Sequence, residues 1–126
     1  MYTVRIREHM LIAHSLPHPF FGPAQNKHGA TYVVDAEFRT SALDEHNVVI
    51  DIGLAHQILR DALAPLNYQD LDDLPEFAGQ LTTTEFLARH IHAAVCQAVP
   101  ATFNGVVKVT LGESHVAWAA YEGPVR

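Results

Sequence analysis

One histidine at the start of an alternating stretch is the clearest candidate for chemistry in this chain. His28 and Ala30 are two residues apart, so their side chains project from the same face of a strand. Histidines at both positions would form a pair of metal ligands, whereas alanine has no lone pair to offer. The pattern therefore supplies only half of a metal-binding pair.

A run of hydroxyl side chains, Thr82-Thr83-Thr84, precedes Glu85 and an apolar stretch. This spacing predicts a capping box, in which the Thr82 hydroxyl accepts a hydrogen bond from the Glu85 amide and the Glu85 side chain reaches back. The run caps a helix whether or not it also contacts a ligand. A short turn is predicted at Gly112-Glu113-Ser114. From this pattern alone, Glu113 is expected to be a charged turn residue exposed to solvent.

The apolar periodicity predicts the elements that must position these residues. Alternation predicts strands over residues 3–12, 32–39, 107–111 and 116–121. Helical spacing predicts one amphipathic helix from an N-cap at Asp51 to near Pro65, whose apolar side is formed by Leu54, Ile58, Leu59, Ala62 and Leu63. It predicts a second helix after Thr82 that buries Leu87, Ile91, Ala94, Val95 and Ala98. We expect residues 67–80 to be an irregular surface loop.

The order strand, strand, helix, helix, strand, strand predicts an α+β fold: a four-stranded antiparallel sheet with both helices on one face. The 126 residues are expected to form a single domain. A sheet this small has two exposed edges, which oligomerisation would cover.

The composition disfavours several classes of partner. The chain has eight Lys and Arg residues and 14 Asp and Glu residues, and it has no run of basic residues. Nucleic acids and anionic membranes are therefore not expected as partners. No apolar run approaches the roughly 20 residues of a membrane helix. The lone Cys96 cannot form an internal disulfide, and the first residues lack the layout of a signal peptide, so we expect a cytoplasmic protein.

Five segments along nearly the whole chain resemble motifs of the 6-pyruvoyltetrahydropterin synthase and 6-carboxytetrahydropterin synthase (QueD-like) family. The segments are Ala13-His14-Ser15-Leu16, His28-Gly29-Ala30-Thr31-Tyr32, Val49-Ile50-Asp51-Ile52, Thr83-Thr84-Glu85-Phe86-Leu87-Ala88 and Val107-Lys108-Val109-Thr110-Leu111-Gly112-Glu113-Ser114. They are similar, in this order, to the family's Ala-His-x-Leu, His-Gly-His-x-Tyr, Val-Met-Asp-Phe, Thr-Ser-Glu-Asn-Leu-Ala and Val-x-Val-x-Glu-Thr. Five motifs in order at family-like spacing identify the chain as resembling this family.

The resemblance implies the tunnelling fold, in which three subunits close their sheets into a barrel and two trimers stack into a homohexamer. It also implies an active site between subunits, where Glu113 anchors the amino group and ring N–H of a pterin. A carboxylate facing two parallel donors makes a bidentate, charge-assisted pair. Thr83 and Thr84 would supply further hydrogen bonds to the ring.

The chain departs from the family at the metal and at the proton-transfer residues. Two of the three zinc-binding histidines match His14 and His28, and Ala30 replaces the third, so we expect no bound zinc. The family's cysteine falls at Ala24 and its Asp-His pair at Asn67-Tyr68. Ala24 and Asn67 cannot transfer protons, so no catalytic residues are assigned.

The resulting hypothesis is a homohexamer that binds a pterin-like or purine-like small molecule through Glu113, Thr83, Thr84, His14 and His28, without catalysing the family's reaction. One alternative is an active metal-dependent lyase in which His18 or His115 rebuilds the ligand set. Another is a structural or partner-binding hexamer whose pocket has no ligand.

Overall fold

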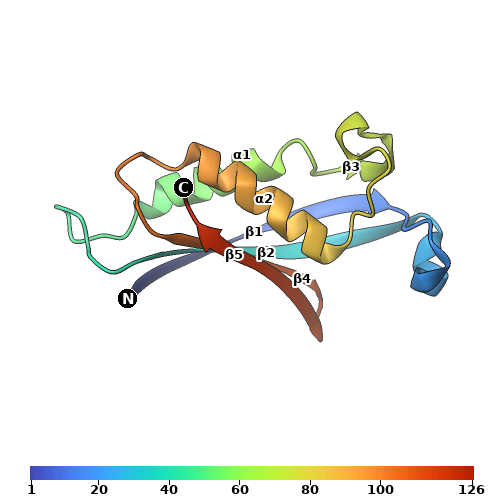
Figure 1. Cartoon of the computed structure of the whole chain (residues 1–126), viewed down its shortest axis with the longest axis horizontal. Coiled ribbons are helices and arrows are strands. Elements are labelled where there is room, and N and C mark those ends of the chain that lie inside the picture. The colour runs from blue at the N-terminus through green and yellow to red at the C-terminus, as the bar shows by residue number, and fades with distance from the viewer.

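A computed structural model describes residues 1–126 of the chain as one twisted sheet with two α-helices on one face (Figure 1). The strands are β1 (Tyr2–His14), β2 (His28–Thr40), β3 (Gln69–Asp70), β4 (Val106–Ser114) and β5 (Ala117–Pro124). The α-helices are α1 (Ile52–Leu63) and α2 (Thr84–Ala98), and the short 3₁₀ helices are η1 (Pro19–Gln25), η2 (Leu71–Asp73) and η3 (Pro75–Phe77). None of the helices is both long and apolar enough to cross a membrane.

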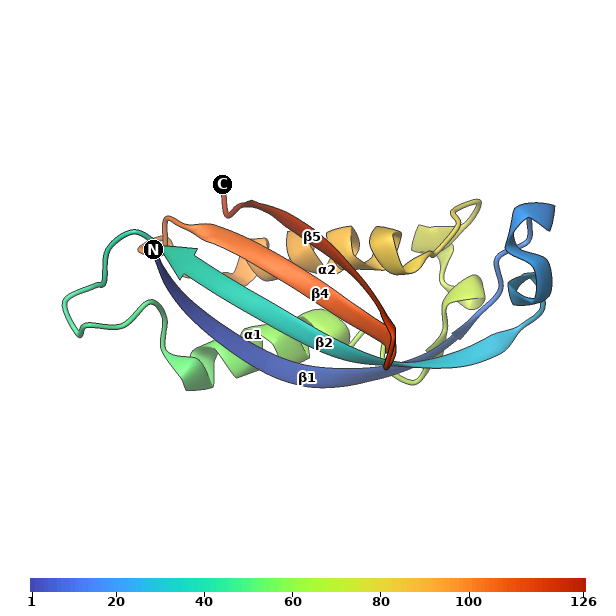
Figure 2. The same ribbon diagram turned by 90° about the horizontal axis from the view of Figure 1, so that it is seen from below.

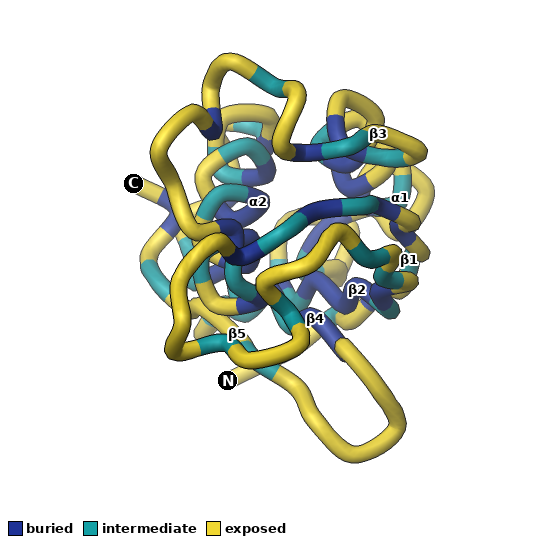
Figure 3. Tube along the Cα trace, turned by 90° about the vertical axis from the view of Figure 1, so that its right-hand side faces the viewer, coloured by how far each residue is buried: buried dark blue, intermediate teal, exposed yellow.

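The core lies between the helices and one face of the sheet, as the buried segments in Figure 3 show. Alternation in β2 buries Tyr32, Val34, Ala36 and Phe38, as the sequence predicts. The helices bury one stripe each, although Leu54 and Ala98, both expected inside, are exposed. No helix covers the opposite face of the sheet, as Figure 2 shows. The residues whose side chains lie on this face are mostly polar.

The sheet has five strands in the order β3-β1-β2-β4-β5, so the prediction of a four-stranded, wholly antiparallel sheet is incomplete. The fifth is β3, two residues that pair in parallel with Ile12 and Ala13 of β1. A two-residue strand is too short to show alternation. Tyr68 precedes it with a positive φ of 61°, and its N–H donates to Leu11 O at 2.7 Å.

Both helices start with side-chain caps, one as predicted and one shifted by a residue. Asp51 caps α1, accepting a hydrogen bond from the Leu54 amide at 2.8 Å, which confirms the prediction. The cap of α2 is Thr83, which accepts from the Phe86 amide at 3.2 Å, so the prediction of Thr82 was wrong. Thr82 instead bonds to His14.

The predicted turn at Gly112-Glu113-Ser114 is part of strand β4. A bulge interrupts the pairing of β4 with β5 between Gly112 and Ser114. An extra residue in one strand turns a side chain away from its regular direction. Glu113 is therefore held by a strand and not by the tip of the hairpin.

Candidate functional site

One cavity of about 230 Å³ brings together all five residues predicted to bind a ligand. It lies at the end of the sheet where β1 ends, β2 begins and α2 begins. Its lining consists of His14, Leu16, Phe21, Ala24, His28, Tyr32, Thr83, Thr84, Glu85 and Glu113. Residues far apart in the sequence thus meet at one place.

The pairing of β1 with β2 places His14 opposite His28. Their ring centroids are 4.6 Å apart and the rings meet edge to face, at 65°. His14 is buried, with 3% of its surface exposed, and its Nδ1 lies 2.9 Å from the Thr82 hydroxyl. The last pair of this antiparallel ladder therefore forms one wall of the cavity.

Both imidazoles are fixed through Nδ1. Nδ1 of His28 is 2.8 Å from the Asn26 carbonyl oxygen, which can only accept, so this nitrogen carries a hydrogen. The pKa of His14 is lowered, first by burial and then by the neighbouring His28. His14 is thus neutral at pH 7 and can form a hydrogen bond with a ligand as an uncharged imidazole.

Tyr32 is a lining residue that the sequence reasoning did not assign to the site. It is 1% exposed, and burial raises the pKa of its hydroxyl, an effect that a hydrogen bond with Thr84 partly offsets. The phenol is therefore a donor at neutral pH. The sequence contains a clue to this role, because Tyr32 is a polar group on the buried face of a strand, four residues after His28.

A cluster of ion pairs holds the loop after β3 against the cavity end of the molecule. Lys27 Nζ lies 2.6 Å from Asp70 and 2.7 Å from Asp72, and Ser15 Oγ donates to Asp72 at 2.6 Å. Hydrogen bonds to Asp70 and then Asp72 raise the pKa of Lys27. Burial alone would raise the pKa of Asp72, but the bonds from Lys27 and Ser15 outweigh it, and that pKa is lowered.

Glu113 borders two hollows, one on each side of the end of β4. Besides the cavity above, it lines a hollow of about 460 Å³ on the open face of the sheet. That outer hollow is lined by Arg7, Thr31, Val33, Gly112, Glu113, Ser114, His115 and Trp118. Glu113 is exposed, and no ion pair or hydrogen bond within the chain uses its carboxylate.

The other residues singled out by the sequence do not join the histidine pair. His18 is exposed and its ring accepts from the Phe20 amide, while His115 borders only the outer hollow. Ala30 packs against the core, and the chain contains no cluster of three His, Cys, Asp or Glu side chains that could hold a metal ion. Asn67 accepts from the Leu11 amide, and Tyr68 is 78% exposed beside the edge of β1.

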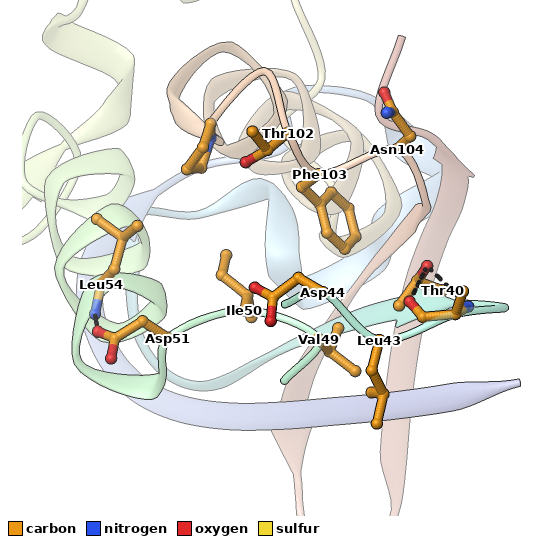
Figure 4. A pocket seen from close by; sticks show the side chains of 12 residues that line it. Thr40, Leu43, Asp44, Val49, Ile50, Asp51, Leu54, Thr102, Phe103 and Asn104 are labelled. Atoms are coloured by element: carbon orange, nitrogen blue, oxygen red, sulfur yellow. Dashed lines mark hydrogen bonds between the residues drawn. The ribbon is translucent and has the colours of Figure 1, made fainter. Parts of the chain in front are cut away.

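A hollow of about 370 Å³ at the start of α1 contains none of the predicted site residues (Figure 4). Its two carboxylates are occupied by the backbone: Asp51 caps α1, and Asp44 accepts from the amides of His46 and Val48. These groups shape a loop and a helix start. The cavity at His14 and His28 is therefore the stronger candidate site.

Comparison with known proteins shows the family to which the chain belongs. The sequence model of the family described as 6-pyruvoyl tetrahydropterin synthase matches residues 3–124. No curated protein matches the chain.

Among solved structures, the Caenorhabditis elegans 6-pyruvoyl tetrahydropterin synthase is similar, with a TM-score of 0.83 and 22% identity over 97% of this chain and 95% of that one. The Plasmodium vivax 6-pyruvoyl tetrahydropterin synthase has a TM-score of 0.77 and 15% identity over 98% and 99%. An uncharacterized protein of Wolinella succinogenes has a TM-score of 0.72 and 15% identity over 95% and 97%. These likenesses establish the fold, and the match over residues 3–124 establishes that the chain belongs to the 6-pyruvoyl tetrahydropterin synthase family.

Proposed function

We propose that the chain binds a pterin-like or purine-like ring through Glu113, with Thr83, Thr84, His14 and His28 around it. One observation carries this proposal: five residues from four separate segments line a single cavity. The Glu113 carboxylate has no partner in the chain, and a ring with an amino group beside an N–H would offer it two parallel donors. The family to which the chain belongs is named for a pterin.

We also propose that the chain does not carry out the family's reaction. Catalytic zinc typically needs three protein ligands and an open position, and here Ala30 stands beside two imidazoles. The residues present therefore do not fit a three-ligand zinc site. Ala24 lines the cavity without a titratable group, and the Asn67 amide is used by the backbone of β1.

The ligand site is tested by calorimetric titration with pterin and with lumazine. Lumazine has the same two rings but carries an oxygen in place of the 2-amino group. We expect pterin to bind, and lumazine to bind much more weakly because it cannot present two donors to Glu113. Glu113→Gln should weaken pterin binding by roughly 10- to 100-fold, since the amide has no charge and only one accepting atom.

The matched control is Glu45→Gln, which removes one carboxylate from an exposed loop and should leave the affinity unchanged. Equal pterin affinity in wild type and Glu113→Gln, or no binding of pterin at all, would contradict the proposal. The second of these results would favour a hexamer with an unused pocket.

Metal content decides the competing proposal of a metal-dependent lyase. We expect protein purified without an affinity tag to contain far less than one zinc per chain. Elemental analysis near one zinc per chain, lost together in His14→Ala and His28→Ala, would favour the lyase.

A further inference from the structure

The cavity at the histidine pair contains carboxylates but no cationic side chain of Lys or Arg. Its ten lining residues include Glu85 and Glu113. The capping box predicted from the sequence would have engaged Glu85, but Thr83 caps α2 and the Glu85 carboxylate has no partner in the chain. His14, whose pKa is lowered first by burial, adds no charge at neutral pH. Both unpaired carboxylates therefore face any ligand without a compensating cation in the lining.

The start of α2 brings a partial positive charge to the cavity, which must be weighed against these carboxylates. A helix N-terminus acts as roughly half a unit charge, and its effect falls off within the first turn. Thr83 already accepts a hydrogen bond from the Phe86 amide, and Glu85 lies in that first turn, where a carboxylate offsets the helix dipole. Two full negative charges outweigh the helix terminus, so the lining is negative on balance.

Most cations of the chain are engaged by carboxylates elsewhere. Five of the eight Lys and Arg residues form ion pairs: Arg5, Arg7, Lys27, Arg39 and Arg60. Lys27 immediately precedes His28, yet its Nζ lies 2.6 Å from Asp70 and 2.7 Å from Asp72. The cation that adjoins the histidine pair in the sequence is thus already neutralised.

The size and the hydrogen-bonding groups of the cavity suit a short substituent on the bound ring. The cavity of about 230 Å³ is smaller than the roughly 300–1,000 Å³ typical of ligand pockets, so a two-ring heterocycle leaves little further space. Nδ1 is already bonded in both imidazoles, to Thr82 and to Asn26, which leaves each Nε2 for a ligand. A hydroxyl group both donates and accepts, so it can bond to Nε2 whether or not that nitrogen carries a hydrogen.

We propose that the ring bound in this cavity carries a short uncharged substituent, such as a hydroxymethyl group, and that the cavity selects against rings with an anionic substituent. This inference rests on the proposed function, because Glu113 must first hold the ring. At an effective dielectric constant near 20, an anion about 10 Å from one carboxylate is repelled enough to bind roughly tenfold more weakly.

Calorimetry with three pterins at pH 7 tests the role of charge. The ligands 6-hydroxymethylpterin, pterin-6-carboxamide and pterin-6-carboxylate share the ring, and the last two have nearly the same shape but differ in charge. We expect the first two to bind, and the carboxylate to bind roughly tenfold more weakly than the carboxamide. Raising NaCl from about 0.05 M to about 1 M should narrow this difference, because salt screens the charges of exposed groups such as Glu85 and Glu113.

Glu85→Gln removes one of the two carboxylates and leaves Glu113 in place. It should reduce the preference for the carboxamide over the carboxylate by roughly threefold or more. The control Glu45→Gln, in an exposed loop, should leave the preference unchanged.

Two results would overturn this inference and leave the Glu113 site standing, provided that Glu113→Gln still weakens 6-hydroxymethylpterin. One is equal affinity of the wild type for the carboxamide and the carboxylate. The other is a preference that persists undiminished in high salt and in Glu85→Gln, because shape and not charge would then exclude the anion. If none of the three pterins binds, both proposals fail.

Discussion

At the scale of single residues, the histidine pair is the part of the site whose chemistry is most constrained. Two imidazolium rings whose centroids are 4.6 Å apart would repel each other, and His14 is buried as well, so the charged form of His14 is disfavoured. Its Nδ1 is satisfied by Thr82, so the pair is stable while His14 is neutral. Protonation of His14 must therefore work against folding.

We expect His14 to make stability depend on pH in a defined window. The pKa of His14 is lowered in the folded chain, by burial and by His28, from an ordinary value of 6.5. The unfolded chain thus binds the proton more readily, so this contribution to stability is complete above about pH 6.5 and is lost as pH falls toward the folded pKa. Urea unfolding at pH 7.5 and pH 5 measures it.

The variant His14→Asn keeps a donor near the Thr82 hydroxyl and removes the titrating group. Its free energy of unfolding should fall less between pH 7.5 and pH 5 than that of wild type. His46→Asn, in an exposed loop, controls for the loss of a histidine as such. An equal pH dependence in wild type and His14→Asn would show that burial of His14 has no energetic effect.

Residue types and family motifs were sufficient to predict which residues gather in the cavity, but not which ones complete it. His14, His28, Thr83, Thr84 and Glu113 were all named from the sequence, and all line one cavity. Tyr32, which also lines the cavity, was not named. It was counted as core because it falls on the apolar face of its strand, and its burial next to the site depends on the folded arrangement of β2 and α2, which the sequence alone does not specify.

At the scale of elements, the long strands and helices could be predicted from the sequence, whereas the shortest strand could not. Alternation and helical spacing predicted four strands and both α-helices, and all of these except β5 bury several side chains on one face. Strand β3 has two residues, and its pairing depends on hydrogen bonds of Tyr68 and Asn67 with Leu11. These few hydrogen bonds form only in the folded chain, so they leave no periodic pattern in the sequence.

The sequence and the structure assign the N-cap of α2 to different threonines, and a stability measurement distinguishes the two assignments. Thr83 is the N-cap, so Thr83→Ala should lower the free energy of unfolding by about 1 kcal/mol, while Thr83→Ser should be close to neutral. The capping box predicted from the sequence would assign this effect to Thr82. Urea denaturation of the two variants measures it at pH 7.5.

Thr82→Val distinguishes the two roles of neighbouring threonines. Thr82 bonds to His14, so its loss should destabilise the chain through the unsatisfied imidazole and should alter the pH dependence. The loss of Thr83 should shift stability equally at both pH values. A pH-dependent effect of Thr83→Ala would mean that the cap is coupled to the histidine pair.

At the scale of the whole molecule, the sheet ends in open edges on both sides (Figure 2). β3 covers only the last part of β1, and β5 has no strand beyond it. Exposed side chains of β5 include Trp118 and Tyr121, with no charged residue from Ala117 to Tyr121. An edge of this kind pairs readily with another strand. We propose that copies of the chain pair at these edges and assemble as a homohexamer of two trimers.

Light scattering coupled to size exclusion should then give a mass close to six times the 13.9 kDa of one chain. Proline at the edge tests the mechanism. Neighbouring residues of an antiparallel edge strand direct their N–H groups to opposite sides, so of Ala119→Pro and Ala120→Pro one removes a bond to β4 and the other removes an outward donor. The variant that loses the outward donor should still show a folded circular dichroism spectrum but should fail to assemble. A monomer in wild type, or assembly unaffected by both prolines, would contradict edge pairing and leave each chain to bind its ligand alone.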